Sequence, residues 1–222
     1  MRGRFITFEG GEGTGKSTHS ALLAARLQAV GIQVVVTREP GGSPAAEVIR
    51  HVLLSGVAKP LGAEAEALLF AAARGDHVSS TIEPALARGR WVISDRFIDS
   101  TRVYQGALGR LDPRFIRALE RVTVGDLRPD LTFVLDVPAE VGLARASKRR
   151  GDGAADRFEA ESRAFHEALR EAYGRLARDE PRRLVMIDGT QPKAAVAEQV
   201  WRTVSERLDS ASAPAVPAGA AP

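Results

Sequence analysis

Eight consecutive residues near the amino terminus carry the clearest chemical signal in this 222-residue chain. Residues 10–17 read Gly-Gly-Glu-Gly-Thr-Gly-Lys-Ser and match the pattern G-x-x-x-x-G-K-[ST] at every fixed position. Glycines let such a loop turn its N–H groups inward around phosphate oxygens, and the dipole of a following helix favours an anion. The pattern predicts a nucleotide site formed by Gly10, Gly11, Glu12, Gly13, Thr14, Gly15, Lys16, Ser17 and Thr18.

Two side chains at the end of this loop have specific predicted roles. Lys16 can reach the β and γ phosphates of ATP, and the Ser17 hydroxyl can ligate Mg²⁺. The alternative is a chance glycine-rich turn. The context argues against it, because the apolar run 5–8 predicts a strand before the loop and the apolar spacing over 17–30 predicts a helix after it.

A second polar cluster follows the apolar run 91–94, which predicts a buried strand. Asp95 can organise Mg²⁺ or its waters, and Arg96 offers a planar fork to a phosphate. The alternative is an ion pair at the end of the strand. GTPases carry an Asn-Lys-x-Asp segment that is not found here, and transport ATPases usually place Glu after this Asp. The Asp-Arg pair therefore favours a kinase.

The strands and helices that must position these residues alternate along the chain. Apolar runs predict strands at 34–36, 131–137 and 184–187 besides the two above, and helical patterns fall at 45–54, 63–73, 78–88, 113–124, 139–147, 157–178 and 193–208. This order predicts an α/β protein with a five-stranded parallel sheet and helices on both faces. We expect one domain over 1–208, and a disordered tail rich in Ala and Pro over 209–222.

Composition excludes several kinds of protein. The chain has no cysteine, so thiolate catalysis, disulfides and cysteine metal sites are excluded. Its apolar runs are too short to span a bilayer, and its first strand lies where a signal peptide would be removed, so we expect a cytoplasmic protein without a membrane partner. The net charge of +3 with only 5% aromatic residues favours a pocket for small anions over a nucleic-acid surface.

Five segments together resemble the bacterial thymidylate kinases. The segment 95–106, Asp-Arg-Phe-Ile-Asp-Ser-Thr-Arg-Val-Tyr-Gln-Gly, is similar to the signature of that family. The loop 37–43, the helix segment 69–74, the lid segment 156–159 with the helix after it, and Phe-Glu-Gly at 8–10 also match. The matches run in order from about residue 5 to residue 190. The resemblance implies a P-loop kinase that converts dTMP to dTDP with ATP and Mg²⁺ for dTTP synthesis, and implies a homodimer.

The resemblance also implies residue roles in the thymidylate pocket. Phe70 would stack on the thymine ring, and Arg74 would hydrogen-bond its carbonyl edge. Arg96 would hold the dTMP phosphate, and Tyr104 would exclude a ribose 2′-hydroxyl. Further contacts are implied for Arg38 or Arg50 at the phosphate, Thr101 at the base and Glu12 at the 3′-hydroxyl. From the residues alone, Phe70 could be core, Arg74 could face solvent and Tyr104 could pack under a loop.

A segment rich in arginine over about 146–157 resembles the family's lid. Some members place an arginine beside the acidic loop residue, where this chain has Gly13, and the bacterial class that it resembles uses lid arginines instead. Arg149, Arg150 and Arg157 are therefore predicted transition-state cations, with no choice among them. The alternative is a basic surface run that keeps the loop soluble. Two other functions stay open at this point: another P-loop nucleotide or nucleoside kinase, and a P-loop switch or partition ATPase.

Overall fold

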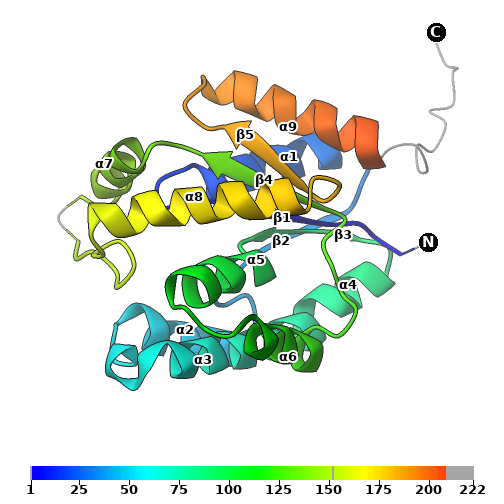
Figure 1. Ribbon diagram of the computed structural model, residues 1–222. Helices are drawn as coiled ribbons and strands as arrows, with labels where there is room; N and C mark the ends of the chain where they lie inside the picture. Colours follow the sequence, from blue (N-terminus) through cyan, green and yellow to red (C-terminus); the bar gives the residue numbers. More distant parts are fainter. Residues whose placement is uncertain (1, 152, 209–222) are drawn as a thin grey trace, which may run out of the picture.

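Five parallel strands form the centre of the molecule (Figure 1). The computed structural model describes residues 2–151 and 153–208, so the tail predicted for 209–222 lies outside the described residues. The strands are β1 (Phe5–Glu9), β2 (Val34–Arg38), β3 (Trp91–Asp95), β4 (Leu131–Asp136) and β5 (Leu184–Asp188), in the spatial order β2-β3-β1-β4-β5. The predicted five-stranded parallel sheet is confirmed.

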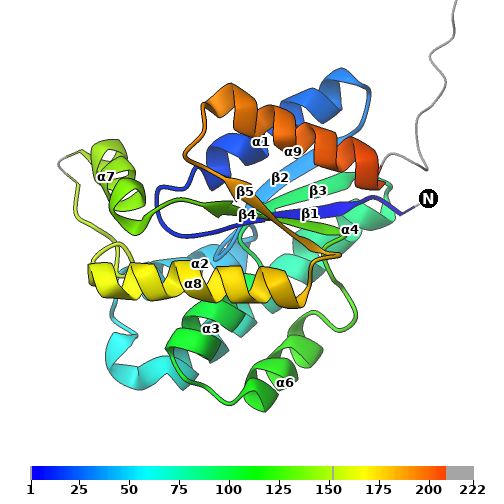
Figure 2. The ribbon, with the colours of Figure 1, turned by 45° about the horizontal axis from the view of Figure 1, so that its top comes forward.

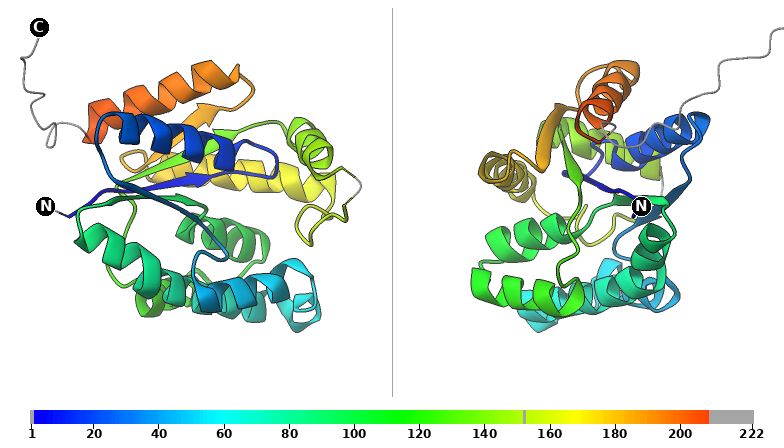
Figure 3. Two further views of the ribbon diagram at one scale, coloured as in Figure 1. Left: turned by 180° about the vertical axis from the view of Figure 1, so that it is seen from behind. Right: turned by 90° about the vertical axis from the view of Figure 1, so that its right-hand side faces the viewer.

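Helices cover both faces of this sheet, as Figure 3 shows. Helices α1 and α9 pack on one face, whereas α4, α5 and α8 pack on the other, with α3 and α6 farther from the sheet on that side (Figure 2). The bounds are α1 Lys16–Ala29, α2 Pro44–Leu54, η1 Lys59–Leu61, α3 Gly62–His77, η2 Val78–Ile82, α4 Glu83–Ala87, α5 Ile98–Thr101, η3 Arg102–Leu108, α6 Pro113–Thr123, α7 Ala139–Arg150, α8 Arg163–Asp179 and α9 Lys193–Leu208.

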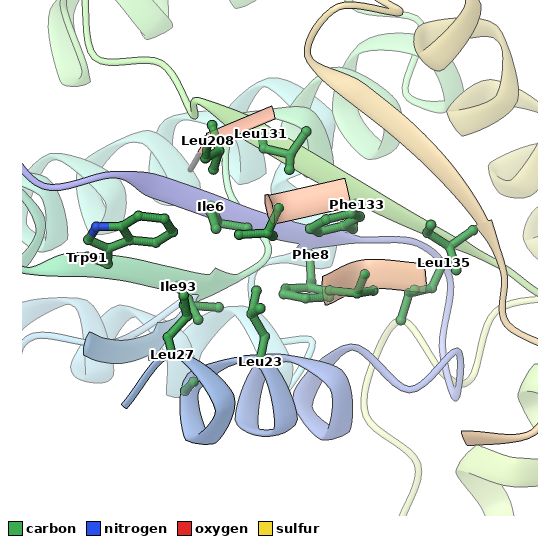
Figure 4. Packing of buried hydrophobic residues seen from close by; sticks show 14 of the residues in the cluster. Ile6, Phe8, Leu23, Leu27, Trp91, Ile93, Leu131, Phe133, Leu135 and Leu208 are labelled. Carbon is green, nitrogen blue, oxygen red and sulfur yellow. The ribbon is translucent and has the colours of Figure 1, made fainter. Parts of the chain in front are cut away.

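The largest apolar cluster holds β1 rigidly beneath the glycine-rich loop (Figure 4). Phe8 and Phe133 lie side by side on neighbouring strands, with ring centroids 5.2 Å apart. Leu23 and Leu27 of α1 pack against them from the same face, and Val200 of α9 completes the layer. Burial of each such side chain contributes about 1.5–3 kcal/mol. The strand that leads into the loop is therefore fixed in place.

Several helical segments differ from the sequence prediction in where they begin, where they end or whether they were predicted at all. The helix predicted over 157–178 begins only at Arg163, because the Ser162 hydroxyl accepts a hydrogen bond from the Phe165 N–H and caps the helix there. Helix α7 continues to Arg150, three residues beyond its predicted end. Residues 98–108 form a short α-helix and a π-helical turn that no apolar period predicts.

No helix within residues 2–151 and 153–208 combines the length and the apolar character that crossing a bilayer requires.

Candidate active site

The two polar clusters of the sequence meet at the carboxyl ends of β1 and β3. These strands are parallel neighbours, and Phe8 lies opposite Asp95 in their register. In open parallel sheets this edge is where ligands bind, because the loops that leave adjacent strands diverge there. The glycine-rich loop leaves β1 and the Asp95-Arg96 pair leaves β3, so the topology brings both to one site.

The glycine-rich loop has the backbone geometry of a phosphate cradle. Gly10, Gly13 and Gly15 have φ of 130°, 66° and 97°, which residues with side chains rarely adopt. The Lys16 ammonium donates to the carbonyl oxygens of Gly11 at 2.7 Å and Gly10 at 3.2 Å. Burial and the nearby Arg96 lower the pKa of Lys16. The lysine thus lies folded over the loop that would hold the phosphates.

Position 13 has no room for a side chain. A Cβ there would lie 2.0 Å from the Gly142 carbonyl oxygen in α7. The arginine that the family resemblance implies for some members at this position would clash with α7 as it lies in this structure.

Ser17 and Asp95 present hard oxygen atoms to one point. The Ser17 hydroxyl donates to the Asp95 carboxylate at 2.5 Å, which joins the first turn of α1 to the end of β3. Magnesium prefers such oxygen donors and keeps several water ligands, so few protein groups are needed. A hydroxyl and a carboxylate beside the phosphate cradle fit that ion.

Arg96 is held at the centre of the site by an unusual backbone conformation. Its φ of 72° lies in the left-handed region, which costs about 1–2 kcal/mol in a residue that is not glycine. Its guanidinium contacts the Glu12 carboxylate at 2.5 Å and lies 5.2 Å from the centre of the Tyr104 ring. Burial alone would raise the pKa of Glu12, but Arg96 and Lys16 together lower it to about 2. Glu12 is therefore a carboxylate at neutral pH.

A pocket of about 330 Å³ opens beside this ion pair. Tyr104 forms one wall and lies at 90° to Phe158, with ring centroids 5.4 Å apart. Phe70 packs against the same Phe158 at 6.0 Å. The predicted site residues that line the pocket are Glu12, Lys16, Ser17, Arg38, Arg50, Phe70, Asp95, Arg96, Thr101, Tyr104 and Arg149.

The two predicted helper arginines are anchored at the pocket rim. Arg38 contacts the Glu47 carboxylate at 3.1 Å, and 56% of its side chain is exposed. The guanidinium of Arg50 donates to the Pro40 carbonyl oxygen at 2.6 Å. Burial and Arg38 lower the pKa of Arg50, and its side chain is better enclosed than that of Arg38.

Arg74 lies behind the pocket wall. Its guanidinium is 97% buried and donates to the carboxylate of Glu39 at 2.7 Å, the hydroxyl of Thr101 at 3.0 Å and the carbonyl oxygen of Phe97 at 3.1 Å. Thr101 itself lines the pocket. The interpretation of Arg74 as a solvated helix face is wrong, because a buried guanidinium must be paired and Glu39 supplies the pair.

The three lid arginines have different surroundings. Arg149 and Arg150 lie in the last turn of α7 and both contact the Glu159 carboxylate, at 2.9 and 2.6 Å. Arg149 also lines a second hollow of about 290 Å³ beside the glycine-rich loop, together with Gly13 and Gly15. Arg157 instead contacts Glu66 at 2.8 Å and stacks over Phe158 at 4.4 Å.

Comparison with known proteins decides the family. The family model described as thymidylate kinase matches residues 8–200. The chain belongs to the thymidylate kinase family. The thymidylate kinase of Afipia carboxidovorans is 62% identical over 210 residues, which are 95% of this chain and 92% of that protein. A thymidylate kinase of Bradyrhizobium sp. strain BTAi1 is 61% identical over 214 residues, which are 96% of this chain and 95% of that protein.

A solved thymidylate kinase has the same fold. The crystal structure of the enzyme from Ehrlichia chaffeensis matches with a TM-score of 0.73 and 32% sequence identity, covering 92% of this chain and 99% of that one. The expected P-loop kinase fold is confirmed, and the interpretation as a switch or partition ATPase is excluded. Membership of the thymidylate kinase family brings with it ATP as co-substrate and a small-molecule acceptor.

Eight other residues that line this thymidylate kinase pocket were not among the predicted ligands: Glu39, Pro40, Leu54, Ser100, Gln105, Asp156, Phe158 and Glu159. All but Leu54 lie inside motifs that carried the resemblance, so the motifs could have indicated them. Ser100 also donates to Glu9 at 2.7 Å, a buried carboxylate that accepts the N–H of Phe97 at 2.8 Å and braces the turn that carries Arg96.

Proposed function

We propose that this protein transfers the γ-phosphate of ATP to dTMP, giving dTDP and ADP, within the site formed by the glycine-rich loop and the adjoining pocket. One observation carries the proposal: residues of the phosphate cradle and residues suited to a nucleoside line the same pocket. A phosphate held by Arg96 in that pocket would face the nucleotide held by the loop. This is the arrangement that a direct in-line transfer requires.

The donor nucleotide would be bound by residues 10–18. Backbone N–H groups of the loop would surround its phosphates, and Lys16 would leave the carbonyl oxygens of Gly10 and Gly11 to reach the β and γ phosphates. Ser17 and Asp95 would hold Mg²⁺. When bound, that ion neutralises charge on the phosphates and orients them. The second hollow, beside Gly13, Gly15 and Arg149, suits the rest of ATP.

The acceptor nucleotide would lie between Arg96 and the aromatic wall. Arg96 would hold the dTMP phosphate, with Arg50 or Arg38 at its outer side. Phe70 would stack on the base, because an aromatic face fits another ring. The further contacts proposed are those that the family resemblance implies: Arg74 and Thr101 at the carbonyl edge of thymine, Tyr104 at the sugar C2′, and Glu12 at the 3′-hydroxyl.

The lid would supply the transition-state cation. The contacts favour Arg149, because it lines both hollows and would lie between the two nucleotides. Arg150 shares the Glu159 carboxylate with Arg149 and is a second choice. Arg157 is the least suited of the three, since its ion pair with Glu66 directs it toward a different hollow.

A homodimer is part of the proposal. Exposed apolar side chains gather on α2, α3 and α6, with Val48 66%, Leu68 51% and Val122 87% exposed. Helix α3 packs against both α2 and α6. A second copy of the chain would cover the exposed apolar side chains of these three helices. The proposed compartment is the cytoplasm, and the proposed partners include neither nucleic acid nor membrane.

A coupled assay for ADP release tests the proposed reaction. With ATP and Mg²⁺ held constant, dTMP, dUMP, UMP, CMP and AMP are offered in turn. We expect dTMP to give the highest kcat/KM. A higher value for any of the other four monophosphates would refute the proposal.

A further inference from the structure

A hydrogen-bonded chain of five buried or half-buried side chains runs from Thr37, near the end of β2, to Thr101, which lines the pocket. The Glu39 carboxylate accepts from Arg74 Nε at 2.7 Å through one oxygen and from His77 Nδ1 at 3.0 Å through the other. His77 Nε2 is hydrogen-bonded to Thr37 Oγ1 at 2.7 Å. At the other end, Arg74 Nη2 donates to Thr101 Oγ1 at 3.0 Å.

The hydrogen bonds within this series of side chains define the tautomer of His77. Glu39 and Arg74 are each more than nine-tenths buried and neutralise one another, and His77 is completely buried. A carboxylate only accepts, so His77 Nδ1 must carry the proton that it donates to Glu39. A neutral ring then leaves Nε2 to accept from the Thr37 hydroxyl.

Local structure explains why these side chains cannot reorient. Arg74 and His77 are three residues apart on α3, so they extend from the same helical face. Gly42 covers the other side: a Cβ there would lie 2.3 Å from Thr37 Oγ1 and 2.5 Å from His77 Nε2. His77, Glu39 and Arg74, in the middle of the series, are buried. A π-helical turn, a feature frequent at functional sites, begins directly after His77.

We infer that His77 is a positioning residue for recognition of the nucleobase. By holding one oxygen of Glu39, it fixes the other oxygen against Arg74 Nε, and so sets the orientation of the Arg74 guanidinium against Thr101, which lines the pocket. The inference rests on the proposed role of Arg74 at the thymine carbonyl edge. His77 touches neither substrate and acts only through Glu39. Its loss would therefore weaken dTMP binding and leave ATP binding and the transfer step intact.

Two amide substitutions at position 77 separate this role from a purely structural one. In His77→Asn the side-chain amide takes the place of Nδ1 and can still donate to Glu39. In His77→Gln the amide takes the place of Nε2 and keeps only the contact to Thr37. We expect His77→Gln to raise the KM for dTMP about tenfold, the usual cost of one hydrogen bond to a charged group. We expect His77→Asn to restore that KM to within about threefold of the wild type. The KM for ATP and kcat should change little in both variants.

The outcomes distinguish the inference from the proposed function. Arg74→Gln serves as the reference, and His77→Gln added to it should raise the dTMP KM no further, because both act at one contact. If Arg74→Gln raises the KM but His77→Gln does not, or if the Asn and Gln variants behave alike, the inference is overturned while the proposed function stands. If Arg74→Gln itself leaves the KM unchanged, the proposed role of Arg74 fails and the inference fails with it.

A second variant covers the case in which the position-77 proteins do not fold. Glu39→Gln has the size of the native residue but carries no charge and accepts through one oxygen only, so the charge-assisted hydrogen bonds that hold Arg74 and His77 are weakened. The inference predicts the same rise in dTMP KM with an unchanged KM for ATP. A Glu39→Gln enzyme with the wild-type KM for dTMP would overturn it. Urea unfolding of each variant verifies that the proteins compared are folded.

Discussion

The guanidinium of Arg96 and the carboxylate of Glu12 form an ion pair that joins the end of β3 to the glycine-rich loop. Both side chains are about 85% buried, and the carbonyl oxygen of Gly10 accepts a further hydrogen bond from Arg96 at 3.1 Å. Glu12 keeps its negative charge through the neutral range because its pKa is lowered to about 2. The fork of Arg96 is thus preorganised at the point where an acceptor phosphate would bind.

Replacing Arg96 by Lys should show that the fork matters as well as the charge. Lysine keeps one positive charge but loses the two parallel donors that suit a phosphate. We expect kcat/KM for dTMP to fall about a hundredfold, equivalent to about 2.7 kcal/mol of transition-state stabilisation. Steady-state kinetics with varied dTMP measures it. The matched control is Arg90→Lys, an exposed arginine at the far end of β3, which should leave kcat/KM unchanged.

Removing the loop lysine should abolish turnover without unfolding the protein. Lys16→Met keeps most of the buried stem but removes the ammonium that would neutralise the β and γ phosphates. We expect kcat to fall by roughly three orders of magnitude, with an unchanged far-ultraviolet circular dichroism spectrum. Near-normal turnover would contradict the assignment of the loop to ATP.

Tyr104 should control the choice between deoxyribose and ribose. Its ring is fixed by edge contact with Phe158 and by Arg96 above it, so it cannot move aside for an extra hydroxyl. We expect Tyr104→Ala to lower the preference for dTMP over its ribose analogue about tenfold. Tyr104→Phe keeps the ring and loses only the 3.3 Å hydrogen bond to Glu12, so it should keep the preference. If the wild type, Tyr104→Ala and Tyr104→Phe all prefer dTMP over its ribose analogue to the same degree, Tyr104 has no role in sugar selection.

The lid arginines should separate into one that acts in transfer and one that stabilises the fold. We expect Arg149→Met to lower kcat by about a thousandfold, since an arginine at the transferring phosphate is worth that much or more. Arg157→Met should lower the free energy of unfolding, because it leaves the buried carboxylate of Glu66 unpaired. Its kcat should stay within a few-fold of the wild type. Kinetics and urea unfolding of both variants measure the two effects. A larger loss of kcat in Arg157→Met than in Arg149→Met would contradict the assignment.

Glu9 should make stability depend on pH. Burial first and Asp99 second raise the pKa of Glu9 to about 7, although Arg96 and the hydroxyls of Ser100 and Tyr173 oppose the rise. The folded state therefore holds a proton that the unfolded state releases near pH 4.5. The stabilisation is complete below that pH and is lost as the pH rises toward 7.

Glu9→Gln isolates this contribution because glutamine does not titrate. The free energy of unfolding of the wild type minus that of the variant should decline by roughly 3 kcal/mol between pH 5 and pH 8. Taking the difference cancels the contributions of His19 and His166, whose pKa values are lowered by burial. Urea unfolding at each pH supplies the values. A difference that stays constant with pH would contradict the raised pKa of Glu9.

Features that depend only on neighbouring residues in the sequence could be predicted from local sequence patterns. The loop 10–17 needs glycines at fixed positions and a lysine after them, so its function is legible from consecutive residues. The five strands also follow from contiguous apolar runs, and the sheet confirms all five. The helix over 98–108 was missed because a π-helical turn has no apolar period of its own.

Contacts between distant segments were decided only by the tertiary structure. The sequence placed Arg149, Arg150 and Arg157 together as one basic run, whereas in the structure Arg149 and Arg150 pair with Glu159 and Arg157 pairs with Glu66. Glu39, in a loop, joins Arg74 and His77, which are 35 and 38 residues away along the chain, and no sequence pattern predicted these contacts. Such pairings depend on the register of the sheet and on how closely helices approach it. The sequence determined which chemistry the chain carries, and the packing of its helices on the sheet decided which side chain performs each part.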